Sequence, residues 1–211
     1  MSDGGEPTGD GDWTPENDAP DGWPVPLRGV TESVIATMGP NGLWNLAALG
    51  LHAGDPVTAR TYGNTRTRRN FERRGGGVVQ FVADPRPFVD AALSIREASE
   101  PVLPSADAWV EVDATLVDSW TEAGTTIREW ELTPGESEVV REDPTTINRG
   151  FGAVVEATVA ASRLGVAGFD DADLRERLDF LAGVVERAGG AREREAMTRI
   201  EEYADWDRPG N

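Results

Sequence analysis

The chain has 211 residues, of which 38 are acidic and 20 are basic, and its formal net charge is −18. It contains no cysteine and a single histidine, His52. This composition excludes disulfides, thiolate metal sites and cysteine nucleophiles, and it disfavours a zinc site or a histidine-based catalytic triad. No apolar run approaches the length that crosses a bilayer, and the first 22 residues lack both a basic start and an apolar middle. We expect a soluble, cytoplasmic protein without a membrane partner.

The acidic surplus has two interpretations. The net charge is −18 and all 20 basic residues are arginines. This acidic, lysine-free surface either avoids nucleic acids or is adapted to molar salt. At about 1 M salt the screening length shrinks to roughly 3 Å, and a like-charged surface then ceases to destabilise the fold and helps solubility. We favour a halophilic cytoplasm. Long-range attraction of an anionic ligand fails in such a medium, so a site for one must rely on direct contacts.

The first part of the chain predicts a tail followed by a hairpin. Residues 1–24 consist mainly of Asp, Glu, Gly, Pro, Ser and Thr, which is typical of a disordered acidic tail. A β-branched strand is expected at residues 30–38. The turn Pro40-Asn41-Gly42 tolerates positive φ and returns the chain as a second strand at residues 43–51. A third strand follows at residues 56–62.

A short helix is expected next, at residues 66–73. Asn64 or Thr65 can cap its exposed N–H groups, and the glycines at residues 75–77 end it. Residues 77–83 then form a compact apolar strand. Asp84 and Pro85 begin a further helix that runs through Leu93, with the proline in its first turn.

The second half begins with a strand and ends in helices. Residues 109–117 alternate between apolar and polar, which indicates a half-buried antiparallel strand. Its inward positions are expected to be Val110, Val112, Ala114 and Leu116. Its partner is expected at residues 125–132, with one more short strand at 139–141. Beyond Pro144 we predict helices at residues 148–164, 170–188 and 191–203. The first has Phe151, Val154, Val155, Thr158 and Val159 along one face.

These elements predict a mainly β, α+β fold in two units. Residues 25–143 would form a β unit of six or seven strands, and residues 144–206 would form a small helical extension. No internal repeat is visible in the sequence.

The segment at residues 60–74 reverses the sign of this acidic chain. It holds six arginines, opposed within the segment by Glu72 alone, and threonines and an asparagine are interleaved with them. Hydroxyls, forked guanidiniums and a helix start are the groups that bind a phosphate. The candidate residues are Arg60, Thr61, Thr65, Arg66, Thr67 and Asn70. The alternative is a solvated basic helix whose arginines pair with neighbouring carboxylates.

Four stretches of the sequence resemble an archaeal family of unknown physiological role. They are G-V-T-E-S-V-I-A-T-M at residues 29–38, R-T-Y-G-N-T-R-T-R-R-N at 60–70, G-V-V-Q-F-V-A-D-P at 77–85, and N-R-G-F-G-A-V-V-E-A-T-V-A-A-S-R at 148–163. Members of that family have an FMN-binding split β-barrel, related to flavin reductases and pyridoxamine-phosphate oxidases. The resemblance covers roughly residues 26–165. The acidic tail and the absence of lysine suggest a haloarchaeal member.

The resemblance implies a ligand and a position for it. Thr65, Arg66, Thr67 and Asn70 would hold the phosphate of FMN, and the strand at residues 43–51 would run along the isoalloxazine ring. Asn45 on that strand either hydrogen-bonds the ring edge or satisfies local backbone. Trp44 either stacks near the ring or packs in the core or a dimer interface. Because the flavin of this fold lies between two subunits, the resemblance also implies a homodimer.

Three classes of function remain in view. The first is an FMN-binding flavoprotein, with a flavin-dependent oxidoreductase of unknown substrate or redox partner as its catalytic form. The second is a non-catalytic module that binds FMN or another phosphorylated small molecule. A nucleic-acid partner is disfavoured, because a net charge of −18 repels a polyanion. Flavin supplies the electron chemistry itself, so we name no catalytic side chain and no metal ligand.

Overall fold

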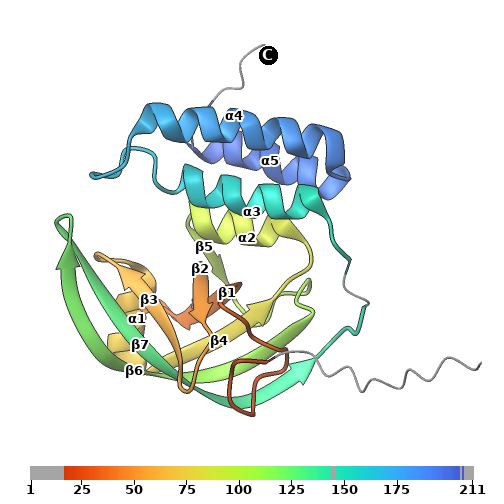
Figure 1. Cartoon of the computed structure of the whole chain (residues 1–211). Helices are drawn as coiled ribbons and strands as arrows, with labels where there is room; N and C mark the ends of the chain where they lie inside the picture. The colour runs from red at the N-terminus through yellow and green to blue at the C-terminus, as the bar shows by residue number, and fades with distance from the viewer. Residues whose placement is uncertain (1–16, 144–145, 205, 207–211) are drawn as a thin grey trace, which may run out of the picture.

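The structure is a computed structural model that describes residues 17–143, 146–204 and 206. This part of the chain forms seven strands and five helices (Figure 1). The strands are β1 Val30–Met38, β2 Trp44–His52, β3 Val57–Tyr62, β4 Gly76–Phe81, β5 Arg96–Ala98, β6 Ala108–Glu122 and β7 Thr125–Val139. The helices are α1 Arg66–Arg74, α2 Pro85–Leu93, α3 Arg149–Ala161, α4 Asp171–Ala188 and α5 Ala191–Ala204.

Six of the strands close into an antiparallel barrel. The sheet order is β1-β4-β6-β7-β3-β2, and β1 pairs with β2 to complete the circle. The seventh strand, β5, lies outside the circle and pairs with residues Trp44 to Leu46 at the start of β2. The predicted fold class, an α+β split barrel with a C-terminal helical extension, is confirmed.

The barrel buries side chains on both faces of its strands, because successive residues point to opposite sides. The inner face forms one core with α1, in which Phe71 packs edge-on against Trp130 at 5.2 Å between ring centroids. The outer face of β1, β2 and β4 forms a second core with α2, which contributes Phe88 and Ala91. Both faces of this side of the barrel are therefore covered, the inner one partly by the helix that carries the arginines.

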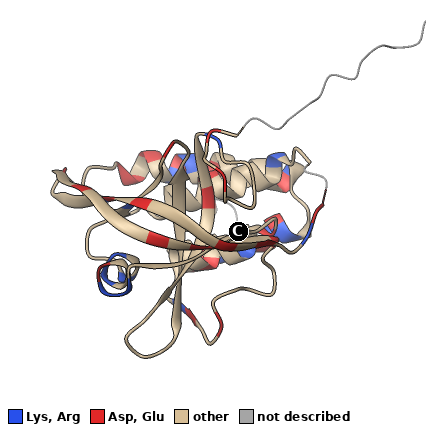
Figure 2. Cartoon of the chain, turned by 90° about the horizontal axis from the view of Figure 1, so that it is seen from below, with Lys and Arg blue, Asp and Glu red and all other residues tan. Residues whose placement is uncertain are grey.

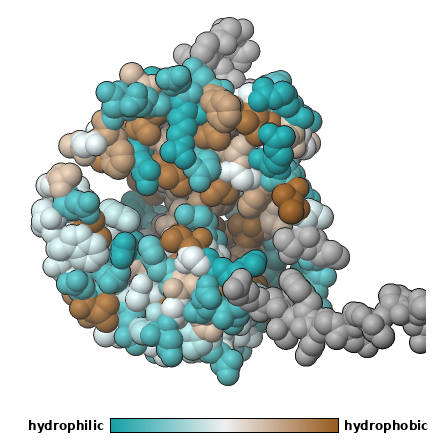
Figure 3. All heavy atoms as spheres, viewed as in Figure 1, coloured by the Kyte–Doolittle hydropathy of each residue, from teal (hydrophilic) through white to brown (hydrophobic). Residues whose placement is uncertain are grey.

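The C-terminal helices form a layer over one side of the barrel (Figure 1). Helices α3, α4 and α5 share a core with Val89 of α2, so α2 belongs to the helical layer although it lies between two strands in the sequence. Figure 3 shows apolar residues gathered where the layer meets the barrel. The close approach of Gly150 to Gly189 fixes the start of α3 against the end of α4, because a Cβ on Gly150 would lie 2.4 Å from the Cα of Gly189.

Several sequence predictions differ from the structure. The separate strand predicted at residues 139–141 does not exist, because β7 continues unbroken to Val139. Leu116, predicted to point inward, is 46% exposed, since the register of β6 and β7 shifts between Leu116 and Asp118. On α3 the buried face is centred on Val154, Ala157 and Thr158, whereas Phe151 is only partly buried, because α4 and α5 cover the alanine-rich side.

The N-terminal tail prediction falls partly outside the described residues. Nothing is described for residues 1–16, but residues 17–24 lie against the barrel. The Asn17 side chain accepts hydrogen bonds from the backbone N–H groups of Ala19 and Leu27, and Trp23 packs against the inner core. The apolar area of Trp23 offsets the ordering cost that the surrounding Asp, Gly and Pro residues cannot offset.

Candidate functional site

The site is built around the start of α1. Thr65 is the N-cap, and its hydroxyl accepts a hydrogen bond from the backbone N–H of Arg68 at 3.2 Å. Gly75 ends the helix in the left-handed conformation, with φ of 77°. The first turn contains no acidic residue, so the remaining free N–H groups and the positive end of the helix dipole favour an anion there. The predicted helix and both of its end signals are confirmed.

Asn70 docks the helix on the barrel. Its side-chain nitrogen donates to the Thr37 hydroxyl at 2.9 Å and to the Thr37 carbonyl at 3.3 Å, and its side-chain oxygen accepts from Arg73. Both ends of the amide are thus engaged within the protein. The sequence named Asn70 with Thr65 as a phosphate-binding residue, but in the structure its side chain holds α1 against β1.

Arg60 and Thr61 point to opposite faces of β3, as neighbouring strand residues must. Thr61 is buried, and its hydroxyl accepts from the indole Nε1 of Trp130 at 2.9 Å. Arg60 forms an ion pair with Glu129 at 2.9 Å and lies over the ring of Trp120. The structure does not bring the Arg60 side chain together with the start of α1. Thr61 instead supports the barrel interior, where its hydroxyl holds the Trp130 indole.

Two buried polar side chains stand apart from the others. The buried polar and charged residues are Ser33, Thr37, Asn45, Thr61, Thr67, Asn70, Gln80, Asp90, Thr158 and Glu193. Eight of these ten have side-chain hydrogen bonds within the described part of the chain. Asn45 and Thr67, which are 6% and 5% exposed, have none. Their polar atoms are not among the enclosed side-chain atoms that lack a partner in the described residues, so water reaches them in the ligand-free protein and a ligand can replace that water.

Asn45 and Thr67 lie in the same region. Asn45 on β2 is paired with Thr37 on β1, and Thr37 is the residue that holds Asn70 of α1. Thr67 lies one helical turn before Asn70 on the buried face of α1. An amide and a hydroxyl, both unpartnered, therefore approach the barrel interior from neighbouring elements. The sequence identified both residues as candidates, and the structure adds that they lack internal partners.

Arg66 is held beside these two residues by a carboxylate. Its Nη1 donates to Glu97 on β5 at 2.8 Å, and Asn41 donates to the same carboxylate at 3.3 Å. Glu97 is also the strand partner of Asn45. Sequence reasoning missed Glu97, because β5 has only three residues and no alternating pattern.

The other α1 arginines carry largely unneutralised charge. Arg68 pairs with Glu72, whereas within the described residues no carboxylate pairs with Arg69, Arg73 or Arg74. Arg69 donates to the backbone and side-chain oxygens of Asn64. Figure 2 shows the basic residues crowded on this short helix, at the left of the view, while acidic residues follow the long strands. The helix is thus a positive region of an acidic protein.

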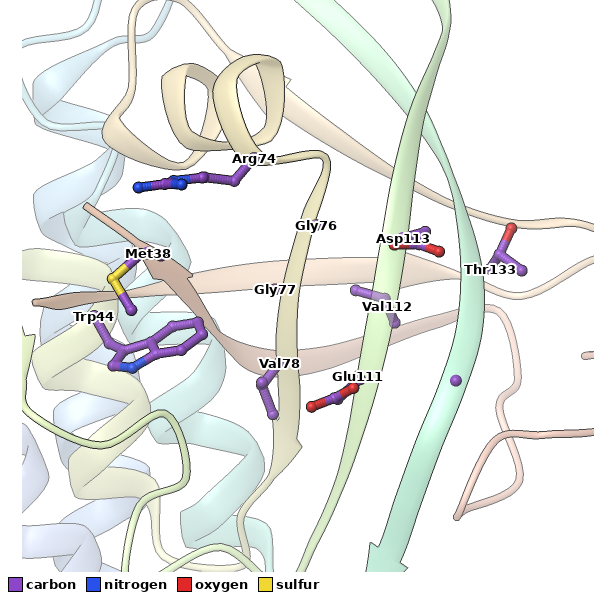
Figure 4. Close-up of a pocket in the computed structure, with 11 residues that line it drawn as sticks. Met38, Trp44, Arg74, Gly76, Gly77, Val78, Glu111, Val112, Asp113 and Thr133 are labelled. Atoms are coloured by element: carbon purple, nitrogen blue, oxygen red, sulfur yellow. The ribbon is translucent and has the colours of Figure 1, made fainter. Parts of the chain in front are cut away.

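A hollow of about 290 Å³ is lined by residues of β4, β6 and β7, by the last residues of β1 and α1, and by the first residue of β2 (Figure 4). Trp44, Met38 and Arg74 line one side of it, and Gly76 and Gly77 of β4 form its floor. None of the seven residues that the sequence identified as cofactor-binding lines this hollow.

The closed antiparallel barrel, the helix start that favours an anion and the C-terminal helical layer make this protein a split β-barrel protein of the α+β class. The chain belongs to the protein family of unknown function DUF447: the model of its N-terminal domain matches residues 31–141, and a second model matches residues 148–202.

One solved structure matches most of the chain. It is the FMN-bound protein MM1853 from Methanosarcina mazei, of the same family, with 26% identity and a TM-score of 0.70 over 84% of this chain and 96% of that one. Flavoredoxin from Methanosarcina acetivorans has 14% identity and a TM-score of 0.37, over 56% of this chain and 72% of its own. The styrene monooxygenase flavin reductase from Pseudomonas putida S12 has 13% identity and a TM-score of 0.36, over 56% and 93%.

Membrane-spanning helices and metal-ligand clusters are both absent from the described residues. None of the described helices has the length and apolar character to cross a membrane. No cluster of three or more His, Asp or Glu side chains in the described segments is arranged to hold a metal ion.

Proposed function

We propose that this protein binds FMN at the start of α1. The observation that carries the proposal is that Asn45 and Thr67 are buried polar residues without a hydrogen-bond partner in the described chain. A bound phosphate would accept from the Thr67 hydroxyl, from Arg66 and from the free N–H groups beside Thr65. Asn45 would hydrogen-bond a polar edge of the ring. The FMN-bound relative in the same family supports this choice of ligand.

The remaining candidates support the site indirectly in this proposal. Asn70 fixes α1 on β1, and Thr61 satisfies the Trp130 indole that packs against Phe71 of α1. Arg60 lies on the outer face of β3 with Glu129, so we assign it no contact with the phosphate. FMN, once bound, would supply electron transfer, and the residues named here would bind and orient it.

The test compares FMN with riboflavin, which lacks the phosphate. Titration of the ligand-free protein should show FMN binding at least tenfold more tightly, since charge-assisted hydrogen bonds contribute about 1.5–3 kcal/mol each. Arg66→Ala should lower the affinity for FMN and leave that for riboflavin unchanged. Arg175→Ala on the exposed face of α4 is the charge-matched control. Equal affinities for the two flavins in the unmodified protein would overturn the phosphate site.

A non-catalytic binding module is the second candidate function. Asn45, Thr67 and Arg66 offer an amide, a hydroxyl and a guanidinium, which bind and orient a ligand, while the electron chemistry of an oxidoreductase would come from FMN. An oxidoreductase would need bound FMN to be reduced by a donor and reoxidised by an acceptor. Rapid-mixing absorbance measurements with nicotinamide donors, oxygen and quinones separate the two: a flavin that none of them reduces or reoxidises indicates a binding module.

We further propose that the protein is a homodimer and that it is adapted to a salt-rich cytoplasm. Exposed apolar side chains on β3 and β6 support the dimer, with Tyr62, Leu116 and Val117 from 46% to 55% exposed. Light scattering in molar KCl should give twice the mass of one chain.

The net charge of −18 predicts that the unfolding midpoint rises with KCl, because salt screens self-repulsion. A monomer that binds FMN would contradict the dimer, and a midpoint independent of KCl would contradict the adaptation to salt.

A further inference from the structure

Strand β5 connects the helical layer to the arginine helix through two adjacent residues. Its three residues pair with the start of β2, with Arg96 opposite Leu46 and Glu97 opposite Asn45. Neighbouring strand residues point to opposite faces. Arg96 accordingly reaches Asp90 of α2, while Glu97 reaches Arg66 of α1. A strand of this length has few backbone bonds of its own, so these two ion pairs add to its pairing with β2 and to the packing of Ala98 in holding it.

On the helical side, β5 is tied to a buried carboxylate. The Asp90 side chain is 5% exposed, and its Oδ2 contacts Arg199 at 2.6 Å and Arg96 at 3.2 Å. Its Oδ1 accepts from the hydroxyl of Tyr203 at 2.9 Å. Burial and the hydrogen bond to Asp90 raise the pKa of Tyr203, so the phenol stays a donor at neutral pH. A buried carboxylate with three donors has little freedom to move. Asp90 therefore ties α2 and α5 to Arg96 of β5.

On the barrel side, Glu97 orients Arg66 without using up its donors. The contact is made by Nη1 alone, at 2.8 Å. A guanidinium has five N–H donors in a rigid fork, so the other N–H groups of Arg66, which have no partner within the described chain, can still bind an anion. Asn41 in the β1–β2 turn donates to both oxygens of the same carboxylate, to Oε1, which Arg66 also contacts, at 3.3 Å and to Oε2 at 3.4 Å. Glu97 therefore sets the direction in which the free donors of Arg66 point.

We propose that Glu97 is a positioning residue for Arg66 and that the C-terminal helical layer sets the affinity of the anion site through Asp90, Arg96 and Glu97. The family relationship does not supply this link, which rests on the contacts of β5. The inference depends on the proposed phosphate site, since Arg66 is the residue whose position it explains. It gives the helical layer a role at the site although no helix of that layer supplies a candidate ligand contact.

The experiment uses the full chain with Glu97→Ala, Glu97→Gln and Arg96→Ala, and with Glu100→Ala as a control on an exposed glutamate just beyond β5. Glu97→Ala should weaken FMN binding about fivefold, the range of a partly exposed ion pair, and leave riboflavin unaffected. Glu97→Gln, which keeps an acceptor for Arg66, should recover part of the loss. FMN binding by Glu97→Ala that equals or exceeds that of the unmodified protein would overturn the positioning role.

Hydrogen exchange without ligand tests the link separately. In Arg96→Ala the amides of β5 should exchange roughly threefold faster than in the unmodified protein and in Glu100→Ala, because a local opening needs less free energy once an ion pair is lost. Unchanged exchange in β5 would overturn the link to the helical layer. If the unmodified protein does not prefer FMN to riboflavin, the proposed function fails instead, and the exchange result still decides whether β5 is held from the helical side.

Discussion

Two regions of the molecule are rich in arginine: the junction between α2, α5 and β5, and the start of α1. They differ in how many of their arginines are paired with carboxylates. At the junction, Arg86 pairs with Asp84 and Glu195, and Arg199 pairs with Asp90 and Glu195. On α1, three of the arginines have no carboxylate partner in the described chain, and Thr67 beside them is buried without a hydrogen bond. The junction satisfies its own charges. Under the proposed function, the donors left unused at the start of α1 are the ones that bind the ligand.

The largest expected effect breaks the junction. Asp90→Ala removes a 5% exposed carboxylate, which leaves Tyr203 without its acceptor and Arg199 with Glu195 as its one remaining carboxylate partner in the described residues. Loss of one partner of a buried ion pair costs about 3 kcal/mol, so the unfolding free energy from denaturant titration should fall by about that much. Asp118→Ala, at an exposed position of β6, is the control. A loss below about 1 kcal/mol would show that the junction contributes little to holding the layers together.

A smaller loss is expected from a satisfied polar group in the barrel. Thr61→Val keeps the shape of the side chain but removes the acceptor of the Trp130 indole, which is 2.9 Å away. The buried N–H is then unpaired, at a cost of about 1–2 kcal/mol. Denaturant unfolding of the ligand-free protein measures it. An unchanged stability would mean that the indole finds another acceptor, and the distinction between satisfied and unsatisfied threonines would be weakened.

The smallest expected effect is on the stability of the protein at acid pH. Hydrogen bonds from Arg199 and Arg86 hold the pKa of Glu195 below its usual value of 4.5. Partial burial works against the ionisation of Asp84, but the hydrogen bonds from Arg86 outweigh it and hold the pKa of Asp84 below 3.8. Because both pKa values are lowered by folding, the stability they contribute is present above the unfolded values and is lost as the pH falls through the folded ones.

Glu195→Gln tests this sign. Between about pH 5 and pH 3 its unfolding midpoint should fall less steeply than that of the unmodified protein, since one carboxylate that binds a proton on unfolding is gone. Glu202→Gln, at an exposed position on α5, should show the unmodified slope. A steeper fall in Glu195→Gln would mean that the carboxylate is not stabilised by its arginines.

The barrel strands and α1 could be predicted from the sequence because their signals are local. Alternating apolar residues mark the strands, and Thr65 and Gly75 mark the ends of the helix. The short strand β5 could not be predicted, since Arg96, Glu97 and Ala98 carry no such pattern. The contact between Arg66 and Glu97 spans 31 residues and exists only because β5 pairs with β2.

The sequence also could not separate free side chains from engaged ones. Thr61, Thr67, Asn45 and Asn70 are alike as residue types, and all four were predicted to bind the cofactor. Closure of the barrel brings Trp130 to Thr61 and Thr37 to Asn70, and it brings no such partner to Thr67 or Asn45. Which polar groups remain for a ligand is therefore a property of the tertiary structure.

Thr67→Val, measured for both stability and FMN affinity, tests whether the unpartnered hydroxyl on α1 binds the ligand. The substitution keeps the shape of the side chain and removes a hydroxyl that has no partner within the described residues. FMN binding should weaken tenfold or more, about 1.5–3 kcal/mol, while the ligand-free protein should be at least as stable as before, in contrast to Thr61→Val. Unchanged FMN affinity, or a loss of stability equal to that of Thr61→Val, would contradict the claim that the unpartnered groups at the start of α1 are reserved for the ligand.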